Sequence, residues 1–252
     1  MARASLGIAA LAVGALLLAE RLWSKRVRTQ EEPERTVRNL ALGAMSLAVV
    51  AGVERPLARA LAVRVEREGL GLAQALPGHG PVVTLVRDAA AMLLLDWSMY
   101  HWHVATHRVP LLWRLHRVHH VDADMDASTA LRFHVVDMMV SVPLRLVQVR
   151  VFGVSPRALA IWQGWFFGSV LFHHADVELG FDRALAWVVT TPGMHDIHHR
   201  ADAAALDSNY SAGLSVWDRL HGTFSEVRPD VGIGVTGDQG FVAALLMPFE
   251  GD

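Results

Sequence analysis

Long apolar segments, separated by short polar stretches, restrict what this chain of 252 residues can fold into. The apolar residues gather in five segments, at 6–23, 40–53, 82–99, 135–154 and 159–172. About 20 mostly apolar residues in a helix cross the hydrocarbon core of a bilayer, which is about 30 Å thick. A further stretch at 241–249 is too short to span and is expected at the membrane interface. The pattern predicts an all-α membrane bundle with about four or five transmembrane segments.

The basic residues between the first two segments predict how this bundle is oriented. Cytoplasmic loops of membrane proteins are enriched in Lys and Arg. Counting segments forward from this loop brings the histidine-rich stretches at 101–120, 173–174 and 195–199 to the same, cytoplasmic side. We therefore expect an integral membrane protein with a histidine-rich helical cap that faces the cytoplasm. The basic residues of the loop are Arg21, Lys25, Arg26, Arg28, Arg35 and Arg38.

Two arginines, Arg145 and Arg150, interrupt the fourth segment. The helix there is either shallow or re-entrant, or it turns these side chains toward protein. The alternative for the whole chain is a soluble protein with very apolar core helices, since 52% of the residues are hydrophobic and 19% are charged. Lys25 is the only lysine, a bias typical of a GC-rich bacterial genome, so a bacterial inner membrane is the expected location.

Charge and cysteine content exclude several classes of protein. The net charge of -2 gives no reason to expect a nucleic-acid partner, which would require a basic patch. The chain has no cysteine, which rules out disulfides, CxxC redox pairs, cysteine zinc sites and cysteine-ligated iron–sulfur clusters. It has 14 histidines, an excess that composition alone does not explain.

Histidines recur at helical spacing in three motifs. His103 and His107 are four residues apart, and the other two motifs share one pattern, a histidine followed by two more at the third and fourth positions. Residues at i, i+3 and i+4 share one face of a helix, so each motif directs its imidazoles toward one point. Thr191 and Pro192 provide a helix start before the last motif. The two triples are His116, His119 and His120, and His195, His198 and His199.

The number and type of these side chains favour two metal ions. Neutral imidazole binds Zn, Cu, Fe and Ni. One ion usually takes about four to six ligands, and the motifs provide more. Soluble di-iron bundles use Glu together with Glu-x-x-His pairs, and no such pattern occurs beside these motifs. A mostly neutral ligand set would leave the metals strongly positive, which favours an electrophilic oxidant.

The three motifs in this order resemble those of the membrane-bound fatty acid hydroxylase and sterol desaturase superfamily. The surrounding stretches 96–103, 110–116, 129–134, 209–210 and 217–220 are also similar to that family. The resemblance covers about 85–225, whereas the first 80 residues contain only apolar segments. It implies a di-iron centre that activates O2 and oxidises an unactivated C–H bond of a lipid, with zinc able to replace iron on overexpression.

The resemblance also implies a ligand set. It comprises the eight motif histidines, His174 as a ninth ligand in preference to His173, and His134 as a possible tenth. Members with the fullest sets have a second ligand four residues before His174, where this chain has Val170. His221 stands where phenylalanine is usual, and Val104 where arginine is usual. The full set is therefore His103, His107, His116, His119, His120, His134, His174, His195, His198 and His199.

Several further residues are candidates for supporting roles. Asp196 is expected in the first turn of its helix, where the helix dipole stabilises an acidic side chain. The alternative is that it accepts a hydrogen bond from the N–H of a ligand imidazole. That role is also open to Asp96, Asp122 and Asp176. Asn209 and Tyr210 are expected to hydrogen-bond near the metals, with an interface anchor as the alternative for Tyr210. Residues 46–53 and 92–95 are candidates for lining an acyl or sterol path.

We therefore divide the chain into three parts and assign a reaction to the second. Residues 1–80 form membrane-anchoring helices, 81–228 a catalytic domain of the fatty acid hydroxylase type, and 229–252 a tail at the interface. The leading hypothesis is an O2-dependent monooxygenase that hydroxylates a sterol or fatty acyl lipid. Its electrons must come from a separate ferredoxin, cytochrome or reductase, because the chain has no cysteine cluster, haem-attachment motif or G-x-G-x-x-G loop.

Three alternatives remain open from the residues. The same site could desaturate a lipid instead of hydroxylating it. It could be a dinuclear zinc hydrolase, although no Glu base of the H-E-x-x-H kind is present. The chain could also be a metal-binding membrane protein without catalytic activity.

Overall fold

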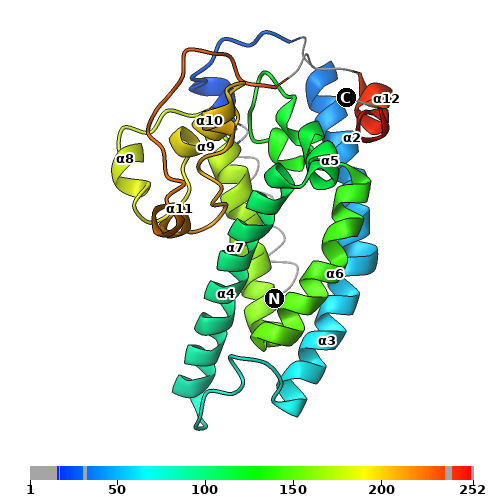
Figure 1. Cartoon of the computed structure of the whole chain (residues 1–252), viewed down its shortest axis with the longest axis vertical. Helices are drawn as coiled ribbons and strands as arrows, with labels where there is room; N and C mark the ends of the chain where they lie inside the picture. Colours follow the sequence, from blue (N-terminus) through cyan, green and yellow to red (C-terminus); the bar gives the residue numbers. More distant parts are fainter. Residues whose placement is uncertain (1–15, 17, 31–32, 236–239, 251–252) are drawn as a thin grey trace.

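The computed structural model describes residues 16, 18–30, 33–235 and 240–250. In this part of the chain the secondary structure is helical, with three isolated β-bridges and no strand, as the sequence predicts. The first apolar segment, 6–23, lies mostly outside the described residues. Figure 1 shows long helices side by side and, at one end of them, a group of short helices and loops. We call the long helices the stalk and the short ones the cap.

The longest helix of the stalk runs from Glu34 to Glu68. It comprises α2 (Glu34–Val49), a π-helical turn η1 (Val50–Glu54) and α3 (Arg55–Glu68), and ends at Gly69 in the left-handed conformation. Among the described residues it is the one helix that is long and apolar enough to cross a bilayer by length and composition. Most residues of its apolar stretch are not buried inside the protein.

Three more helices complete the stalk. They are α4 (Pro81–Arg108), α6 (Val135–Phe152) and α7 (Pro156–His174). Gly153 ends α6 in the left-handed conformation, and its backbone touches that of Gly71, so neither position has room for a side chain. Ser155 then caps α7 and Pro156 begins it. Small residues such as Ala58, Ala62 and Ala91 let these helices pack closely.

Arg145 of α6 turns inward and does not face lipid. Its Nε lies 3.5 Å from Glu54, its guanidinium stacks 4.4 Å from the ring centre of Trp162, and Gln148 accepts from it. Arg150 is exposed at the end of the same helix. Of the two explanations for arginines in this segment, the structure therefore supports a protein-facing side chain for Arg145.

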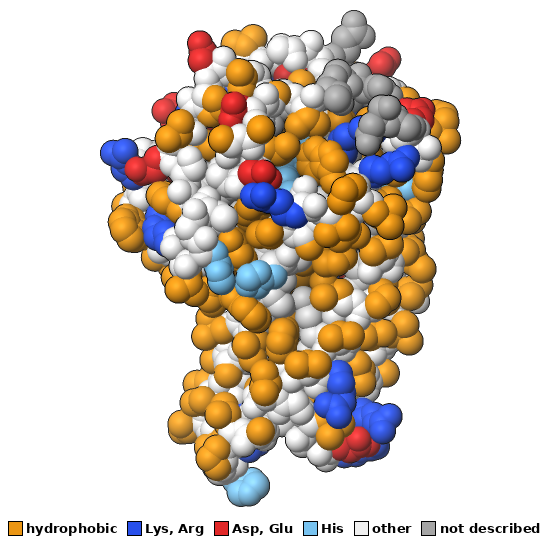
Figure 2. All heavy atoms as spheres, viewed as in Figure 1, with side chains coloured by type: hydrophobic (Ala, Val, Ile, Leu, Met, Phe, Trp, Pro, Cys, Tyr) orange, Lys and Arg blue, Asp and Glu red, His pale blue; other side chains and the backbone are white. Residues whose placement is uncertain are grey.

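Side chains on the molecular surface separate by type along the long axis. On the face seen in Figure 2, apolar side chains cover much of the stalk, and most charged side chains lie at the cap and at the opposite end. Exposed apolar residues of the stalk include Leu47, Leu57, Val86 and Val147. The stalk therefore presents an apolar surface between two charged ends on this face.

The cap contains short helices and the segment that precedes α2. The helices are α5 (Pro110–His120), η2 (Thr129–Leu131), α8 (Asp182–Leu185), α9 (Pro192–His198), α10 (Ala203–Leu206) and α11 (Val216–His221). Near the C-terminus, α12 (Phe241–Leu246) and η3 (Met247–Phe249) pack against α5 through Val118, Val121 and Met247.

Basic residues before α2 and in its first turn form ion pairs with acidic residues of the cap. Arg35 is 1% exposed and holds both Asp122 and Asp126, at 2.7 and 2.8 Å. Burial would raise the pKa of Asp122, but the Arg35 guanidinium outweighs this effect and holds the pKa well below its ordinary value. Arg28 pairs with Asp126 at 3.2 Å, and Thr29 donates to Asp124. These contacts fix the loop that follows the histidines of α5.

Candidate metal centre

Four elements carry the histidines of the predicted site to one place in the cap. His103 and His107 lie one turn apart near the end of α4, and His174 is the last residue of α7. The two triples lie on α5 and α9, each helix beginning with proline. Thr191 caps α9 as predicted, since its hydroxyl accepts from the backbone N–H of Met194. The ends of two long stalk helices and two short cap helices thus hold the histidines in place.

The expectation that each motif directs its imidazoles toward one point is wrong for the two triples, because each triple is divided between two groups of imidazoles. Residues i and i+4 project in nearly the same direction from a helix, whereas i+3 lies on the other side of i, about 100° from i+4. His116 and His120 therefore belong to one group and His119 to the other. On α9, His195 and His199 join the group of His119, while His198 lies with the other.

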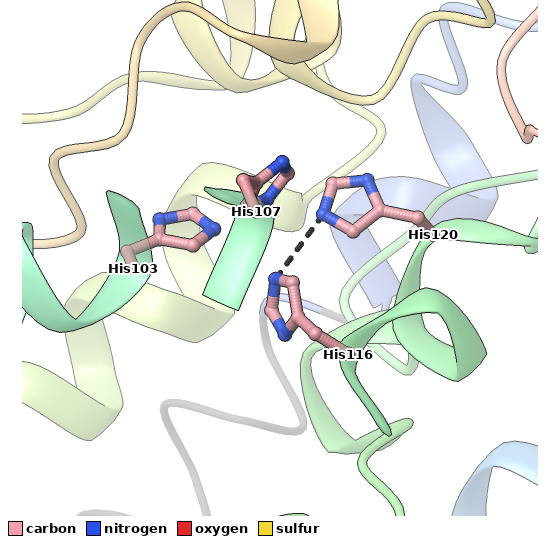
Figure 3. A group of neighbouring side chains, drawn as sticks. All are labelled: His103, His107, His116 and His120. Carbon is pink, nitrogen blue, oxygen red and sulfur yellow. Dashed lines mark hydrogen bonds between the residues drawn. The ribbon is translucent and has the colours of Figure 1, made fainter. Parts of the chain in front are cut away.

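The first group contains His103, His107, His116 and His120, with ligand atoms within 4.8 Å of one another (Figure 3). The Nε2 atoms of His116 and His120 are 3.2 Å apart. His198 adds a fifth ring, with its Nε2 3.1 Å from that of His103.

The second group consists of His119, His174, His195 and His199, all buried. Nε2 of His174 lies 3.0 Å from Nε2 of both His119 and His195, and His199 lies 3.1 Å from His195. The two groups are adjacent, because His120 of the first stacks on His199 of the second with 4.2 Å between ring centres. The cap therefore holds two neighbouring sets of converging ring nitrogens.

Backbone carbonyls fix the tautomer of three of these rings. Nδ1 of His103 donates to the carbonyl of Tyr210 at 2.6 Å, Nδ1 of His174 to Val170 at 2.7 Å, and Nδ1 of His198 to Ser208 at 2.7 Å. A carbonyl only accepts, so each of these Nδ1 atoms carries the proton. Nε2 then presents a lone pair to the group, which is the arrangement of metal-binding histidines.

The nitrogen spacings fit metal ions better than hydrogen bonds among the rings. Adjacent ligands of an octahedral ion with bonds of about 2.1 Å are about 3.0 Å apart. His174 has its proton on Nδ1, so its Nε2 acts as acceptor for two neighbours at once. The other ring nitrogens of His116, His119, His120, His195 and His199 have no hydrogen-bond partner, and His107 has none at either nitrogen.

The electrostatics of the cap also favour neutral ligands. Burial, aided by neighbouring imidazoles, lowers the pKa of His195 and His199 well below the ordinary value. Burial lowers the pKa of His198 to about 3. Neutral imidazole is the form that binds a metal. The residues present therefore fit two cations, each surrounded by histidine nitrogens.

The remaining histidines lie outside both groups. His134 caps α6, because its Nδ1 accepts from Val136 and its Nε2 donates to the carbonyl of Leu245, each at 3.2 Å. With both nitrogens engaged there, it takes no part in either group. His173 is buried beside the second group, with its ring centre 4.1 Å from that of His195.

Asn209 and Tyr210 lie in the loop beside the first group. The Tyr210 ring packs against His103, His107 and His198, and its hydroxyl donates to Asp207 at 2.7 Å. Asn209 has a positive φ of 51° and joins two segments, donating to the carbonyls of Met194 and Ser225.

Asp196 has a different environment from the one expected. It lies beyond the first turn of α9, so the expected first-turn position is wrong. Its carboxylate pairs with Arg26, Arg200 and Arg228, at 2.6, 3.1 and 2.9 Å, and not with a histidine. Three of the ligand histidines donate their N–H to backbone carbonyls instead, and no side-chain pattern marks such partners in a sequence.

Gly213 allows Asp96 of α4 to hold the loop that carries Tyr210. Asp96 accepts from the backbone N–H of Leu214 at 2.9 Å and from Trp217 Nε1 at 2.7 Å. A Cβ at Gly213 would collide with the Asp96 carboxylate, which is 3% exposed and cannot move aside freely.

The Gly213→Ala variant is therefore expected to lose about 1–3 kcal/mol of stability, the usual cost of overpacking. The displaced loop would also weaken the bond from His103 to the Tyr210 carbonyl. Thermal unfolding of the full-length protein, with Gly180→Ala as the control, measures this effect. Gly180 has open space around its Cβ position. Equal melting temperatures for the two variants would contradict the close contact between Gly213 and Asp96.

Comparison with known proteins identifies the family. The model of the fatty acid hydroxylase family matches residues 89–223, which include all nine histidines of the two groups. The chain belongs to the fatty acid hydroxylase family. No solved structure matches it.

Proteins similar to this chain include lipid hydroxylases and monooxygenases. The chain is 28% identical over 239 residues to ornithine lipid hydroxylase OlsE of Rhizobium tropici, an alignment of 91% of this chain and 69% of that protein. It is 30% identical over 152 residues to human alkylglycerol monooxygenase, covering 58% of this chain and 32% of that one. A cholesterol 25-hydroxylase-like protein of Danio rerio is 30% identical over 157 residues, or 56% and 57% of the two chains. The chain thus spans about a third of the length of alkylglycerol monooxygenase.

Proposed function

We propose that this protein is an O2-dependent membrane hydroxylase that oxidises a C–H bond of a lipid at a dinuclear iron centre. The observation that carries the proposal is the convergence of nine histidines in two adjacent groups, with the ring nitrogens 3.0–3.2 Å apart where they meet. Relatives that carry the names lipid hydroxylase and monooxygenase support this reaction class.

The proposed reaction needs two electrons from outside the chain. One atom of O2 enters the C–H bond, and the other leaves as water with two electrons and two protons. The metal ions, when bound, supply the oxidising chemistry that activates O2. We propose a separate ferredoxin, cytochrome or reductase as the donor, because the sequence carries no redox motif of its own.

The residues of the chain hold the ligands and keep water away. The carbonyls of Val170, Ser208 and Tyr210 hold three imidazoles with Nε2 facing the metals. The four histidines of the second group are buried, which excludes water from that side. A set of neutral ligands leaves the positive charge of the ions uncompensated, which suits an oxidant better than the mild Lewis acid of a hydrolase.

The proposed location is a bilayer, with the cap on the cytoplasmic side. The apolar surface of the stalk between two charged ends supports this proposal (Figure 2). We retain about four or five transmembrane segments as the proposed number, with the helix Glu34–Glu68 as the strongest candidate. A substrate dissolved in the membrane would then reach the cap from the stalk side.

The proposal is tested by product analysis under isotopic O2. The full-length, iron-loaded protein in nanodiscs receives membrane lipid extract and a chemical or ferredoxin reductant. We expect one labelled oxygen atom in a lipid product, and no product from the His119→Ala and His198→Ala variants. Loss of two hydrogens without oxygen would indicate a desaturase. Turnover without O2 and reductant would support a hydrolase and contradict the proposal.

A further inference from the structure

An apolar groove runs along the stalk between α4 and α7, directly below the cap. Its volume is about 510 Å³, within the range of pockets that hold small molecules. Leu85, Ala89 and Leu93 line one wall and Ile161 and Trp165 the other. These residues face outward, so the groove opens sideways onto the apolar surface of the stalk. Leu93 and Met92, which also lines the groove, fall in the stretch 92–95 that the sequence analysis singled out.

The two ends of the groove differ in what they offer a ligand. At the far end, Arg157 pairs with Asp88 at 3.2 Å, and Ser155 donates to the same carboxylate at 2.6 Å. The charge of this arginine is thus already balanced. Asp96 and Leu214 line the cap end. From Asp96, His103 of the first metal group is seven residues further along α4, or about 10 Å.

The level at which the apolar surface ends is visible along α4. Val82, Leu85, Val86 and Leu93 are exposed apolar residues, and the next strongly exposed positions are polar: His101, then Arg108 at 59% exposure. Figure 2 shows histidine side chains at the cap edge of the apolar surface. Along α4, the exposed side chains therefore change from apolar to polar at about His101, and exposed apolar residues return only after the helix, at Val109 and Leu111.

An aromatic and polar cluster marks the same level. Trp97 Nε1 donates to Nε2 of His221 at 3.2 Å, the ring of Tyr100 stacks on His221, and His101 lies against both. Trp and Tyr favour the headgroup region of a bilayer, where one end of the ring is apolar and the other is wet. His221, which departs from the usual phenylalanine of the family, thus has a place at this boundary.

The metal groups lie on the water side of this boundary, and the groove lies on the lipid side. His103 and His107 are two and six residues beyond His101, or about 3 and 9 Å along the helix. A lipid whose chain fills the groove has its polar end at the level of the cap. Only bonds close to that end can then approach the metals.

We propose that the groove between α4 and α7 takes the hydrocarbon chain of a membrane lipid, and that oxidation therefore occurs at or next to the lipid headgroup. The position of oxidation rests on the proposed function, whereas chain binding rests only on the proposed location in a bilayer. The opposite orientation, with the headgroup at Arg157 and the chain end toward the metals, is disfavoured because Asp88 already neutralises that arginine.

Chain binding is tested by photo-crosslinking, which does not require turnover. Full-length protein is reconstituted in vesicles that contain a phosphatidylethanolamine with a diazirine near the end of one acyl chain. We expect adducts to concentrate on 85–93 and 161–165. The Ala89→Trp variant fills the groove and should lower the yield at these peptides about tenfold. Val86→Trp is the matched control, since Val86 is exposed on the same helix but does not line the groove.

Adducts spread evenly over the stalk, or an equal yield from both variants, would overturn the groove as a chain site. The position of oxidation is read by fragmenting the labelled product of the iron-loaded protein. Oxygen on the headgroup or on a carbon next to it is expected. Oxygen in the middle or at the end of the chain would overturn the regiochemistry. If no lipid is oxidised at all, the proposed function fails, and the crosslinks still decide whether the groove binds a chain.

Discussion

Replacing His195 by alanine is expected to lower lipid oxidation at least about 100-fold and to remove about half of the bound metal. Mutation of a residue that only hydrogen-bonds to a metal ligand already lowers metal affinity or activity about 10–100-fold. His195 lies between His174 and His199 in the second group, with its Nε2 3.0 and 3.1 Å from theirs. Removing it leaves three ligands and a cavity in the middle of the group. The first group retains its histidines, because His198 lies on the other side of α9.

Metal analysis of the full-length variant by mass spectrometry measures this effect, and it counts iron and zinc alike. His79→Ala is the control for the loss of an exposed histidine. His134→Ala separates the ligand sets, because its ring nitrogens bond to Val136 and Leu245. We expect this variant to keep its metal and to lose about 1 kcal/mol of stability from the helix cap. Metal loss equal to that of His195→Ala would place His134 among the ligands.

The helices and the metal-binding motifs were predictable because both depend on local spacing. Apolar runs bounded by Gly153 and Ser155–Pro156 define α6 and α7 to within two or three residues. The segment at 82–99 proved too short, since α4 continues to Arg108. Its last turns carry His103 and His107. Because histidine has a low hydropathy, the apolar segment ends before these turns, although the helix continues into the cap.

The division of each triple between two groups depends on tertiary packing, which the spacing does not reveal. Spacing places i, i+3 and i+4 on one broad face of a helix, but only the packing of the helices around the site decides which of these histidines meet. The partners of the imidazoles were not predictable either, because a backbone carbonyl such as that of Ser208 leaves no trace in the sequence. Asp96, Asp122 and Asp176 have the right chemistry, yet they bind Trp217, Arg35 and Arg26 instead.

The basic residues before α2 and in its first turn have a structural role in addition to the role in membrane orientation that the sequence indicates. Positive charge on the cytoplasmic side needs no particular position within a loop. Arg26, Arg28 and Arg35, by contrast, each pair with a specific carboxylate of the cap. Arg26 and Arg28 therefore tie the segment before α2 to the cap, and Arg35 ties the first turn of α2 to it.

The Arg35→Met variant is expected to destabilise the protein by about 3–5 kcal/mol, because it leaves a buried carboxylate without its counter-charge. Arg35 and Asp122 are 1% and 0% exposed, and two bonds of 2.7 and 2.8 Å join them. Asp122 lies two residues after His120, so the loosened loop should also lower metal occupancy. Arg64→Met is the control, since water screens the exposed Arg64–Glu68 pair and it contributes little to stability.

A second substitution shows whether the loss comes from the buried charge. Asp122→Asn removes the charge but keeps an acceptor for Thr129, whose hydroxyl lies 2.7 Å away. The Arg35→Met/Asp122→Asn double variant should therefore recover about half of the stability that Arg35→Met loses. Thermal unfolding of the unsubstituted protein, the two single variants and the double variant gives the coupling free energy between Arg35 and Asp122. If Arg35→Met melts no lower than Arg64→Met, the ion pairs of Arg35 do not hold the start of α2 to the cap.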